Sequence, residues 1–451
     1  MAQSLNEPID ILLKKSIMCG CQRTHKTNLK NIVIEVNAID NLPRLLKEYL
    51  GRKLLLVVDL NTKLAAGDRI LSILGNYGYN LRMHIIEKDI VPNETDIGEM
   101  AIELTDDIDV IIAVGSGALH DLLKYISYIT DTPLISIPTA ASNDRYAMPY
   151  SFFFNNGKKH IEKAQVPETM IIDLNVIAAA PKHMASAGAA AVLSKHISLF
   201  DWKLSQIVDE TVYCNDLAEA MLYHIYNFTD SLSGSRPLYS LESLELLMKA
   251  LVFSGVLVSF CESLSPTFGS ETLMSDCILM TDSYSKNIYS EQYIKAVTAA
   301  NCTRIVEGII QSENLDFSKA KTLLDDYGWV MHNNEINRVY SDDVWQVLSL
   351  SGGFTRYNKE THARRLFAIT DRWKEIVEAA SSIVPEYATF KEILRSCVLP
   401  YRFEDLNMTR EQAIDAVLWS SELSNRYSLL SLIWEVGEID SIAYVLTSKM
   451  K

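Results

Sequence analysis

The stretch DVIIAVGSGALHD, residues 109–121, decides how the first half of the chain is expected to fold. Five apolar residues, 110–114, form a run typical of a buried parallel strand, and Gly115-Ser116-Gly117 follow directly. Helical spacing begins at residue 118. Glycines let the backbone approach a phosphate, and the N–H groups of a helix N-terminus face an anion. The stretch therefore predicts either a nucleotide-binding loop or a plain tight turn of an α/β sheet.

Strand and helix patterns alternate on both sides of this stretch. Further strands are expected at residues 52–59, 81–89, 133–138 and 168–173, and helices at 62–78, 95–107 and 118–129. Such alternation predicts a Rossmann-like α/β domain with a mostly parallel sheet covered on both faces. Ligands of these sheets bind beyond the carboxyl ends of the strands, where the loop at Gly115 falls.

From about residue 181 the strand signal nearly disappears. Apolar residues recur at three- and four-residue spacing, and Thr409 with Gln412 has the pattern of a capping box. We expect an α/β nucleotide-binding domain at residues 1–180 and an all-helical domain at residues 181–451.

The overall charge is acidic, with 42 Lys and Arg against 57 Asp and Glu and a formal net charge of −15. This balance argues against nucleic acid or an anionic membrane as the main partner. The sequence shows no apolar run long enough for a membrane span and no pattern typical of a secretory leader. We therefore predict a cytoplasmic protein. A homo-oligomer is compatible with these features.

Polar residues stand where other predicted strands end. Asp59 could bind a ribose hydroxyl or cap the next helix, and Thr139 and Ser142 could bind a ligand or stabilise a turn. Near the N-terminus, Cys19 and Cys21 are followed by His25. These three side chains could bind a metal, or the cysteines could be plain reduced thiols, because a second pair at structural-zinc spacing is missing from the sequence.

Several motifs together resemble the sn-glycerol-1-phosphate dehydrogenases, within the superfamily of glycerol dehydrogenases, iron-containing alcohol dehydrogenases and dehydroquinate synthases. VGSGALHD is similar to the family's glycine-rich loop, and PTAASNDRYA to its PTAxSxDGYA segment. The resemblance extends in order over nearly the whole chain. It implies a dehydroquinate synthase-like fold whose helical domain carries the metal and substrate side of the cleft. It also implies NAD or NADP as cofactor and reduction of dihydroxyacetone phosphate with a zinc, nickel or iron ion held by one Asp and two His.

The three positions that match the family's metal ligands carry other residues: Ala191, Thr272 and Tyr289. A methyl group, a neutral hydroxyl and a phenol cannot rebuild the site, so we predict that the family metal is absent. Asp276 replaces a substrate-contacting His. Arg145 replaces the glycine after Asp144, and Met148 replaces a serine near the expected nicotinamide.

A relocated metal site on Glu271, Asp276, His196 and Asp201 is a further hypothesis, although His196 on an apolar helix is also typical of packing. The nucleotide half matches better. The resemblance assigns cofactor binding to these residues: Asp59, Gly115, Ser116, Gly117, Asp121, Thr139 and Ser142. Alternatively, Asp121 is a first-turn helix acid. Asp144 and Asp276 are tentative catalytic candidates, and Asp144 could instead pair with Arg145 or another loop cation.

The sequence thus leaves three hypotheses. The chain is a nucleotide-binding homologue, a pseudoenzyme that has lost metal-dependent hydride transfer. Or it is an oxidoreductase that reduces a small phosphorylated ketone or polyol precursor by altered or metal-independent chemistry. In that case Asp144, Asp276, Lys195 or Tyr289 would act as acid, base or carbonyl polariser. Or it is an ordinary metal-dependent dehydrogenase with misaligned ligands. The expected partners are a small-molecule nucleotide and a small phosphorylated substrate.

Overall fold

The computed structural model describes residues 17–450, with gaps at 89, 105–106, 156–157, 233–236, 282–290, 312–316, 326–327, 345–346, 348 and 350–357. The chain forms two compact units. The first comprises Met1–Val192 and Asn215–Ser263, and the second Leu193–Cys214 and Leu264–Lys451. The chain therefore passes from one unit to the other three times.

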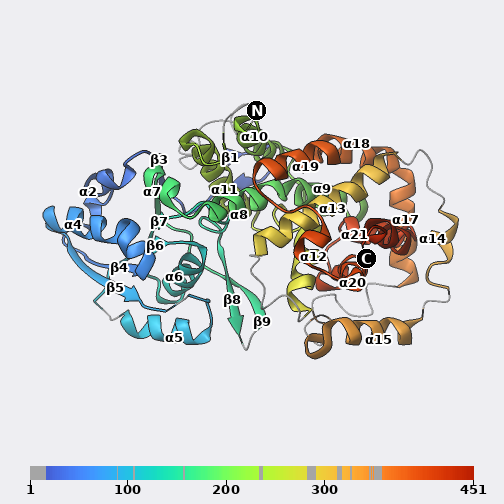
Figure 1. The fold of residues 1–451 in the computed structure, drawn as a ribbon, viewed down its shortest axis with the longest axis horizontal. Coiled ribbons are helices and arrows are strands. Elements are labelled where there is room, and N and C mark those ends of the chain that lie inside the picture. Colours follow the sequence, from blue (N-terminus) through green and yellow to red (C-terminus); the bar gives the residue numbers. More distant parts are fainter. Residues whose placement is uncertain are drawn as a thin grey trace. The chain divides into compact units, whose positions relative to one another are not determined.

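A six-stranded parallel sheet is the centre of the first unit (Figure 1). Its strands follow the order β3-β10-β7-β6-β4-β5. Their bounds are β3 Asn31–Glu35, β4 Lys53–Asp59, β5 Asn80–Ile86, β6 Val110–Gly115, β7 Leu134–Pro138 and β10 Thr169–Asp173. The five strands predicted from apolar runs are confirmed. β3 was not predicted: its five residues lie at the edge of the sheet, and only Ile32 is fully buried.

Both faces of this sheet are covered, as the near-continuous apolar strands require. One face of β4 and β6 packs against α2 (Leu42–Leu45) and α4 (Asp68–Asn76). The other face packs against α5 (Glu94–Glu103) and α6 (Gly117–Thr130). In β4 the alternation is direct: Leu54, Leu56 and Val58 face the first pair of helices, and Leu55 and Val57 face the second.

Three helices that we had assigned to the helical domain complete the first unit. They are α8 (Lys182–Leu193) up to Val192, α10 (Asn215–Ser231) and α11 (Leu241–Cys261). The expected boundary at residue 180 therefore differs from the division of the structure. By length and composition, α11 is long and apolar enough to cross a membrane. However, 72% of its most apolar 18-residue stretch is buried inside the protein, as in a core helix.

The second unit is helical in the part that the structure describes (Figure 1, yellow to red). Its longer helices are α9 Lys195–Asp209, α12 Ser270–Met280, α13 Glu291–Gln311, α15 Trp329–Tyr340, α17 Lys359–Asp371, α18 Trp373–Ile383, α19 Tyr387–Ser396, α20 Arg410–Trp419, α21 Leu429–Glu435 and α22 Ile439–Thr447. The capping box predicted at Thr409 is confirmed, with Thr409 Oγ1 accepting from the Gln412 amide at 3.2 Å.

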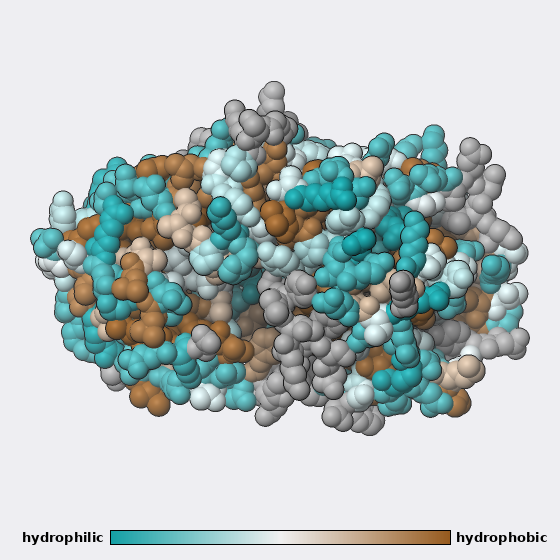
Figure 2. Space-filling model, in the orientation of Figure 1, coloured by the Kyte–Doolittle hydropathy of each residue, from teal (hydrophilic) through white to brown (hydrophobic). Residues whose placement is uncertain are grey.

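Two small antiparallel pairs add to the first unit: β1 (Ile17–Met18) with β2 (Thr24–His25), and β8 (Tyr150–Asn155) with β9 (Lys158–Lys163). On the face seen in Figure 2, apolar and hydrophilic residues are interspersed. The exposed apolar side chains, such as Leu64 and Ile102, are scattered over different elements.

Candidate functional site

The carboxyl edge of the parallel sheet contains its topological switch point. From β4 the chain continues to β5 on one side, and from β6 it continues to β7 on the other. Ligands of doubly wound sheets bind at such a point. Asp59 ends β4, Gly115 ends β6, and Thr139 follows β7, in which Pro138 is in register with Gly115. The structure therefore brings these three predicted residues to one edge of one sheet.

The glycine-rich turn leads directly into α6. Ser116 is the N-cap residue, and its side chain makes no capping hydrogen bond. A Cβ atom on Gly117 would lie 1.8 Å from Nδ2 of Asn143, so the missing side chain lets Asn143 pack against the start of the helix. The Asn143 amide donates to Ser142 Oγ at 3.3 Å, and its oxygen accepts from the Arg145 amide at 2.9 Å. Sequence reasoning missed Asn143, because only the fold brings it to the turn.

His120 replaces the third glycine of the dinucleotide pattern and stabilises the turn. Its Nδ1 lies 2.9 Å from the carbonyl oxygen of Ser116, and its Nε2 lies 2.8 Å from Ser136 Oγ. A carbonyl only accepts, so Nδ1 carries the proton and Nε2 accepts from the serine hydroxyl. Burial lowers the pKa of His120 to about 4. His120 is therefore a neutral bracing residue at physiological pH.

Asp59 has the geometry of a helix cap. Its Oδ1 accepts from the Thr62 amide at 2.8 Å, and Thr62 Oγ1 accepts from the Asp59 amide at 3.0 Å. This reciprocal pair is a capping box for α3 (Leu60–Thr62). The side chain is half-buried at the carboxyl edge. The cap fixes its orientation, and binding of a ribose remains a prediction.

Asp121 and Arg145 form a buried ion pair, with Arg145 Nε 2.9 Å from Asp121 Oδ2. The Asp121 side chain is 2% exposed. Lys124 lies on the same helix with Nζ 3.9 Å from Asp121 Oδ1, and it donates to the carbonyl oxygens of Arg145 and Tyr150 at 2.8 and 2.6 Å. Burial lowers the pKa of Lys124 to about 8. Asp121 is therefore an ion-pair partner rather than a first-turn acid, and Arg145 binds Asp121 where we had considered Asp144.

Asp144 contacts α11, where its Oδ2 accepts from Ser254 Oγ at 2.9 Å. The loop around it approaches two helices closely. A Cβ atom on Gly255 would lie 2.8 Å from the Met148 amide nitrogen, and one on Gly188 would lie 2.2 Å from the Ala141 carbonyl oxygen. Ser142 lies 3.2 Å from the Tyr146 hydroxyl, which donates to the Ala140 carbonyl at 2.7 Å. These contacts pack residues 140–148 against α8 and α11.

The two described positions that match the family's metal ligands are buried. Ala191 is on α8 with 1% of its surface exposed. Thr272 is on α12 and fully buried, and its hydroxyl donates to Glu271 Oε1 at 2.9 Å. Tyr289 lies outside the described residues. A methyl group and a hydroxyl already engaged by a neighbour do not fit a zinc, nickel or iron ion.

Around Thr272 the second unit contains a buried charged cluster. Asp201 Oδ2 accepts from Ser270 Oγ at 2.7 Å, and Asp201 Oδ1 accepts from the Leu429 amide at 2.7 Å. Burial and the neighbouring Glu271 raise the pKa of Asp201 to about 7. Burial also raises the pKa of Glu271 and lowers that of Arg426. A cavity of about 20 Å³ beside Asp201 and Arg426 has room for about one water molecule.

The other candidates of the second unit are separate from this cavity. His196 Nδ1 lies 2.6 Å from the Ile383 carbonyl oxygen, and burial lowers its pKa to about 4, as expected of a packing residue. Lys195 Nζ donates to the Thr267 carbonyl at 3.2 Å. Asp276 is half-buried on α12.

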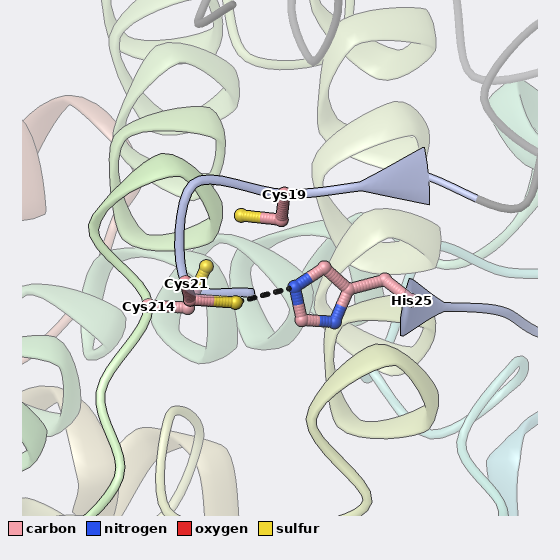
Figure 3. Close-up of side chains that lie close together, drawn as sticks. All are labelled: Cys19, Cys21, His25 and Cys214. Atoms are coloured by element: carbon pink, nitrogen blue, oxygen red, sulfur yellow. Dashed lines mark hydrogen bonds between the residues drawn. The ribbon is translucent and has the colours of Figure 1, made fainter. Parts of the chain in front are cut away.

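Among the described residues, one group of metal-type side chains stands out, and it is at the N-terminal turn rather than at the family's positions. Figure 3 shows Cys19, Cys21, His25 and Cys214, whose ligand atoms all lie within 4.8 Å of one another. The predicted absence of a metal therefore applies only to the family's ligand positions, because this group could hold a metal ion elsewhere in the chain. Cys214 was not part of the predicted trio, because nearly two hundred residues separate it from the turn.

The comparisons with known proteins agree with this architecture. A family model described as iron-containing alcohol dehydrogenase matches residues 33–181. A protein of Halalkalibacterium halodurans named glycerol-1-phosphate dehydrogenase is 27% identical over 265 residues, 57% of this chain and 65% of that relative. A protein of the same name from Methanosarcina barkeri is 32% identical over 227 residues, 50% of this chain and 62% of that relative. The matches thus span less than two thirds of either relative.

Solved structures extend the likeness to nearly the whole chain. Glycerol dehydrogenase from Schizosaccharomyces pombe aligns with a TM-score of 0.57 at 14% identity, covering 93% of this chain and 91% of that one. A 1,3-propanediol oxidoreductase aligns with a TM-score of 0.59 at 15% identity, covering 92% and 98%. At these identities the alignments show a common fold, a parallel α/β domain followed by helices.

Proposed function

Because this chain belongs to the superfamily of glycerol-1-phosphate dehydrogenases and iron-containing alcohol dehydrogenases, we propose that it binds NAD or NADP but has lost metal-dependent hydride transfer. Its relatives include proteins named glycerol-1-phosphate dehydrogenase (NAD(P)+), which supports a dinucleotide cofactor. The loss of metal-dependent hydride transfer is supported above all by Ala191 and Thr272. These two residues, at two of the family's ligand positions, are buried and have no side-chain group suited to a divalent metal.

Support for dinucleotide binding comes from the carboxyl edge of the sheet. The N–H groups at the start of α6 would hold the pyrophosphate, and the half-buried Asp59 would accept from a ribose hydroxyl. When bound, the cofactor would supply or accept a hydride. The residues at the carboxyl edge of the sheet would bind and orient the cofactor. Thr139 and Ser142, beside the glycine turn, would take part in this binding.

Support for the loss of catalysis comes from the chemistry of carbonyl reduction. Negative charge builds on the carbonyl oxygen during hydride transfer, and a cation or strong donors must be held against it. Two cations beside the glycine turn are already engaged, Arg145 of the loop by Asp121 and Lys124 of α6 by two backbone carbonyls. We therefore place neither in a catalytic role.

The nucleotide part of the proposal is tested at Ser116. Its side chain makes no capping bond, and both Asp and Asn are good N-cap residues, so either substitution should preserve or raise stability. Ser116→Asp places a negative charge where the pyrophosphate would bind, whereas Ser116→Asn is neutral and of equal size. We expect calorimetry to show affinity for NAD(H) or NADP(H) weakened at least about tenfold by Asp, a cost of about 1.4 kcal/mol, and little changed by Asn. Absence of binding by the wild-type protein would refute the nucleotide site.

The catalytic part is tested by reduction of dihydroxyacetone phosphate with NADH and NADPH, with and without chelator. We expect a rate at least about a thousandfold below that of a family enzyme, equivalent to about 4 kcal/mol of lost transition-state stabilisation. Chelator-sensitive turnover would show an ordinary metal-dependent dehydrogenase. Chelator-resistant turnover that Asp144→Ala or Asp276→Ala abolishes would support metal-independent reduction of a small phosphorylated ketone or polyol precursor. We also propose a cytoplasmic location and a role either in sensing the nucleotide or in binding a partner.

A further inference from the structure

The hairpin of β1 and β2 contains three side chains that commonly bind zinc. Cys19 and Cys21 lie in the turn, and His25 ends β2. Cys214 directly precedes Asn215, the first residue of α10, and its sulfur is the fourth ligand atom of the group. Figure 3 shows the three sulfurs and the imidazole ring close together. Cys19, His25 and Cys214 are buried, and Cys21 is half-buried.

The tautomer of His25 suits a metal ligand. Its Nδ1 lies 2.8 Å from the carbonyl oxygen of Phe260 on α11. A carbonyl can only accept, so Nδ1 carries the proton and Nε2 keeps its lone pair. Nε2 faces the cluster and lies 3.2 Å from the Cys21 sulfur. A metal-bound histidine typically donates its second N–H to a carbonyl or carboxylate in this way, which fixes the ring and makes the free nitrogen a better ligand.

The first turn of α10 holds the cysteine loop in place. Asp216 Oδ2 accepts from the Gly20 amide at 3.3 Å and from the Cys19 thiol at 3.2 Å. Gln22, with φ of 63°, closes the turn by donating from its amide to the Cys19 carbonyl at 3.0 Å. Because Asp216 is two residues beyond Cys214, the same short segment carries one ligand and anchors another. The four ligand atoms are therefore brought together by contacts that need no metal.

We propose that Cys19, Cys21, His25 and Cys214 bind a structural zinc ion. Three thiols and one imidazole form a closed tetrahedral donor set of the kind that structural zinc sites use, with no position left open for a substrate. On binding, each thiol loses its proton to solvent and becomes a thiolate, and the histidine stays neutral. The ion would fasten the N-terminal turn to α10 and, through His25, to α11. This site shares no residue with the nucleotide site, so either proposal can fail without the other.

The experiment measures metal in protein purified without a histidine tag from zinc-supplemented cells under reducing conditions. Elemental analysis for zinc, iron, copper and nickel should give about one zinc per chain. The variants Cys21→Ser and Cys214→Ser should lose it. Cys261→Ser is the matched control, because Cys261 follows Phe260 at the end of α11 but is not in the group, and it should retain the zinc.

A second measurement uses only the wild-type protein, in case a variant fails to fold. Zinc is removed with chelator and replaced by cobalt, which should give the absorption bands of a tetrahedral, thiolate-rich site. Zinc removal should lower the melting midpoint by at least about 4 °C, because the metal binds only the folded state. Protein without zinc, zinc retained by both Cys21→Ser and Cys214→Ser, another metal in its place, or a disulfide among these cysteines would each overturn the proposal.

Discussion

Replacing Arg145 by Met tests whether the loop beside the glycine turn is held by a buried charge. Asp121 is 2% exposed and 2.9 Å from Arg145 Nε, so loss of the guanidinium leaves a carboxylate in the interior. Breaking a buried pair costs about 3–5 kcal/mol. Lys124 lies 3.9 Å from the other carboxylate oxygen and remains as a weaker partner. We therefore expect the free energy of unfolding to fall by about 3 kcal/mol, the lower end of this range. Met retains part of the packing over Phe152, whose ring centre is 4.7 Å from the guanidinium carbon.

The matched variants complete a double-mutant cycle. Asp121→Asn should cost less, about 1–2 kcal/mol, because the 16%-exposed Arg145 side chain still reaches water. Asp121→Asn with Arg145→Met should cost less than the sum of the single changes, with a coupling of at least about 1.5 kcal/mol.

The distribution of tryptophan allows the two units to be followed separately. All six tryptophans lie in the second unit, so their fluorescence during urea unfolding is an internal control that these changes should leave unaltered. Hydrogen exchange of the α6 amides would follow the first unit. Costs that add within about 0.5 kcal/mol would refute the ion pair as the element that holds the loop.

Two further predictions use the same assays. Gly117→Ala should destabilise the first unit by at least about 2 kcal/mol, because its Cβ would lie 1.8 Å from Asn143 Nδ2. The control Gly98→Ala, on α5 with no atom within 4 Å of its Cβ, should be neutral or stabilising, and equal effects of the two would contradict the close approach. Lowering the pH from 7.5 to 5 should weaken the first unit by about 4 kcal/mol, because burial lowers the pKa of both His120 and His224 to about 4. A folded-state pKa below the unfolded value of 6.5 means that this stability is present above pH 6.5 and is lost as the pH falls toward 4. A free energy of unfolding independent of pH in that window would contradict the prediction.

The parallel sheet could be predicted because its strands are buried on both faces. Continuous apolar runs ending in Asp59 and Gly115 have few other interpretations, and parallel strands necessarily bring these ends to one edge. Local signals also sufficed for the capping box at Thr409, whose partners are three residues apart.

Contacts between distant residues could not be predicted. Arg145 binds Asp121 across 24 positions, and Asp144 accepts from Ser254 across 110. Each of these side chains also has a possible partner nearby in the sequence. Only the packing of α6, the loop and α11 determines which partner it contacts. Cys214 illustrates the same limit, since the turn at Cys19 gives no sign of a fourth ligand so far along the chain.

The position of β10 in the sheet bears on how the protein is made. β10 lies between β3 and β7, and its pairing with β3 joins Asn31 to Thr169. When β3 leaves the ribosome, β10, its one neighbour among the described strands, is more than a hundred residues from being synthesised. Helices α10 and α11 follow later still. Unpaired strand edges are prone to aggregation. The nascent first unit therefore depends on remaining soluble with an incomplete sheet, and slow translation before residue 173 should reduce the yield of folded protein more than the same delay placed after residue 263.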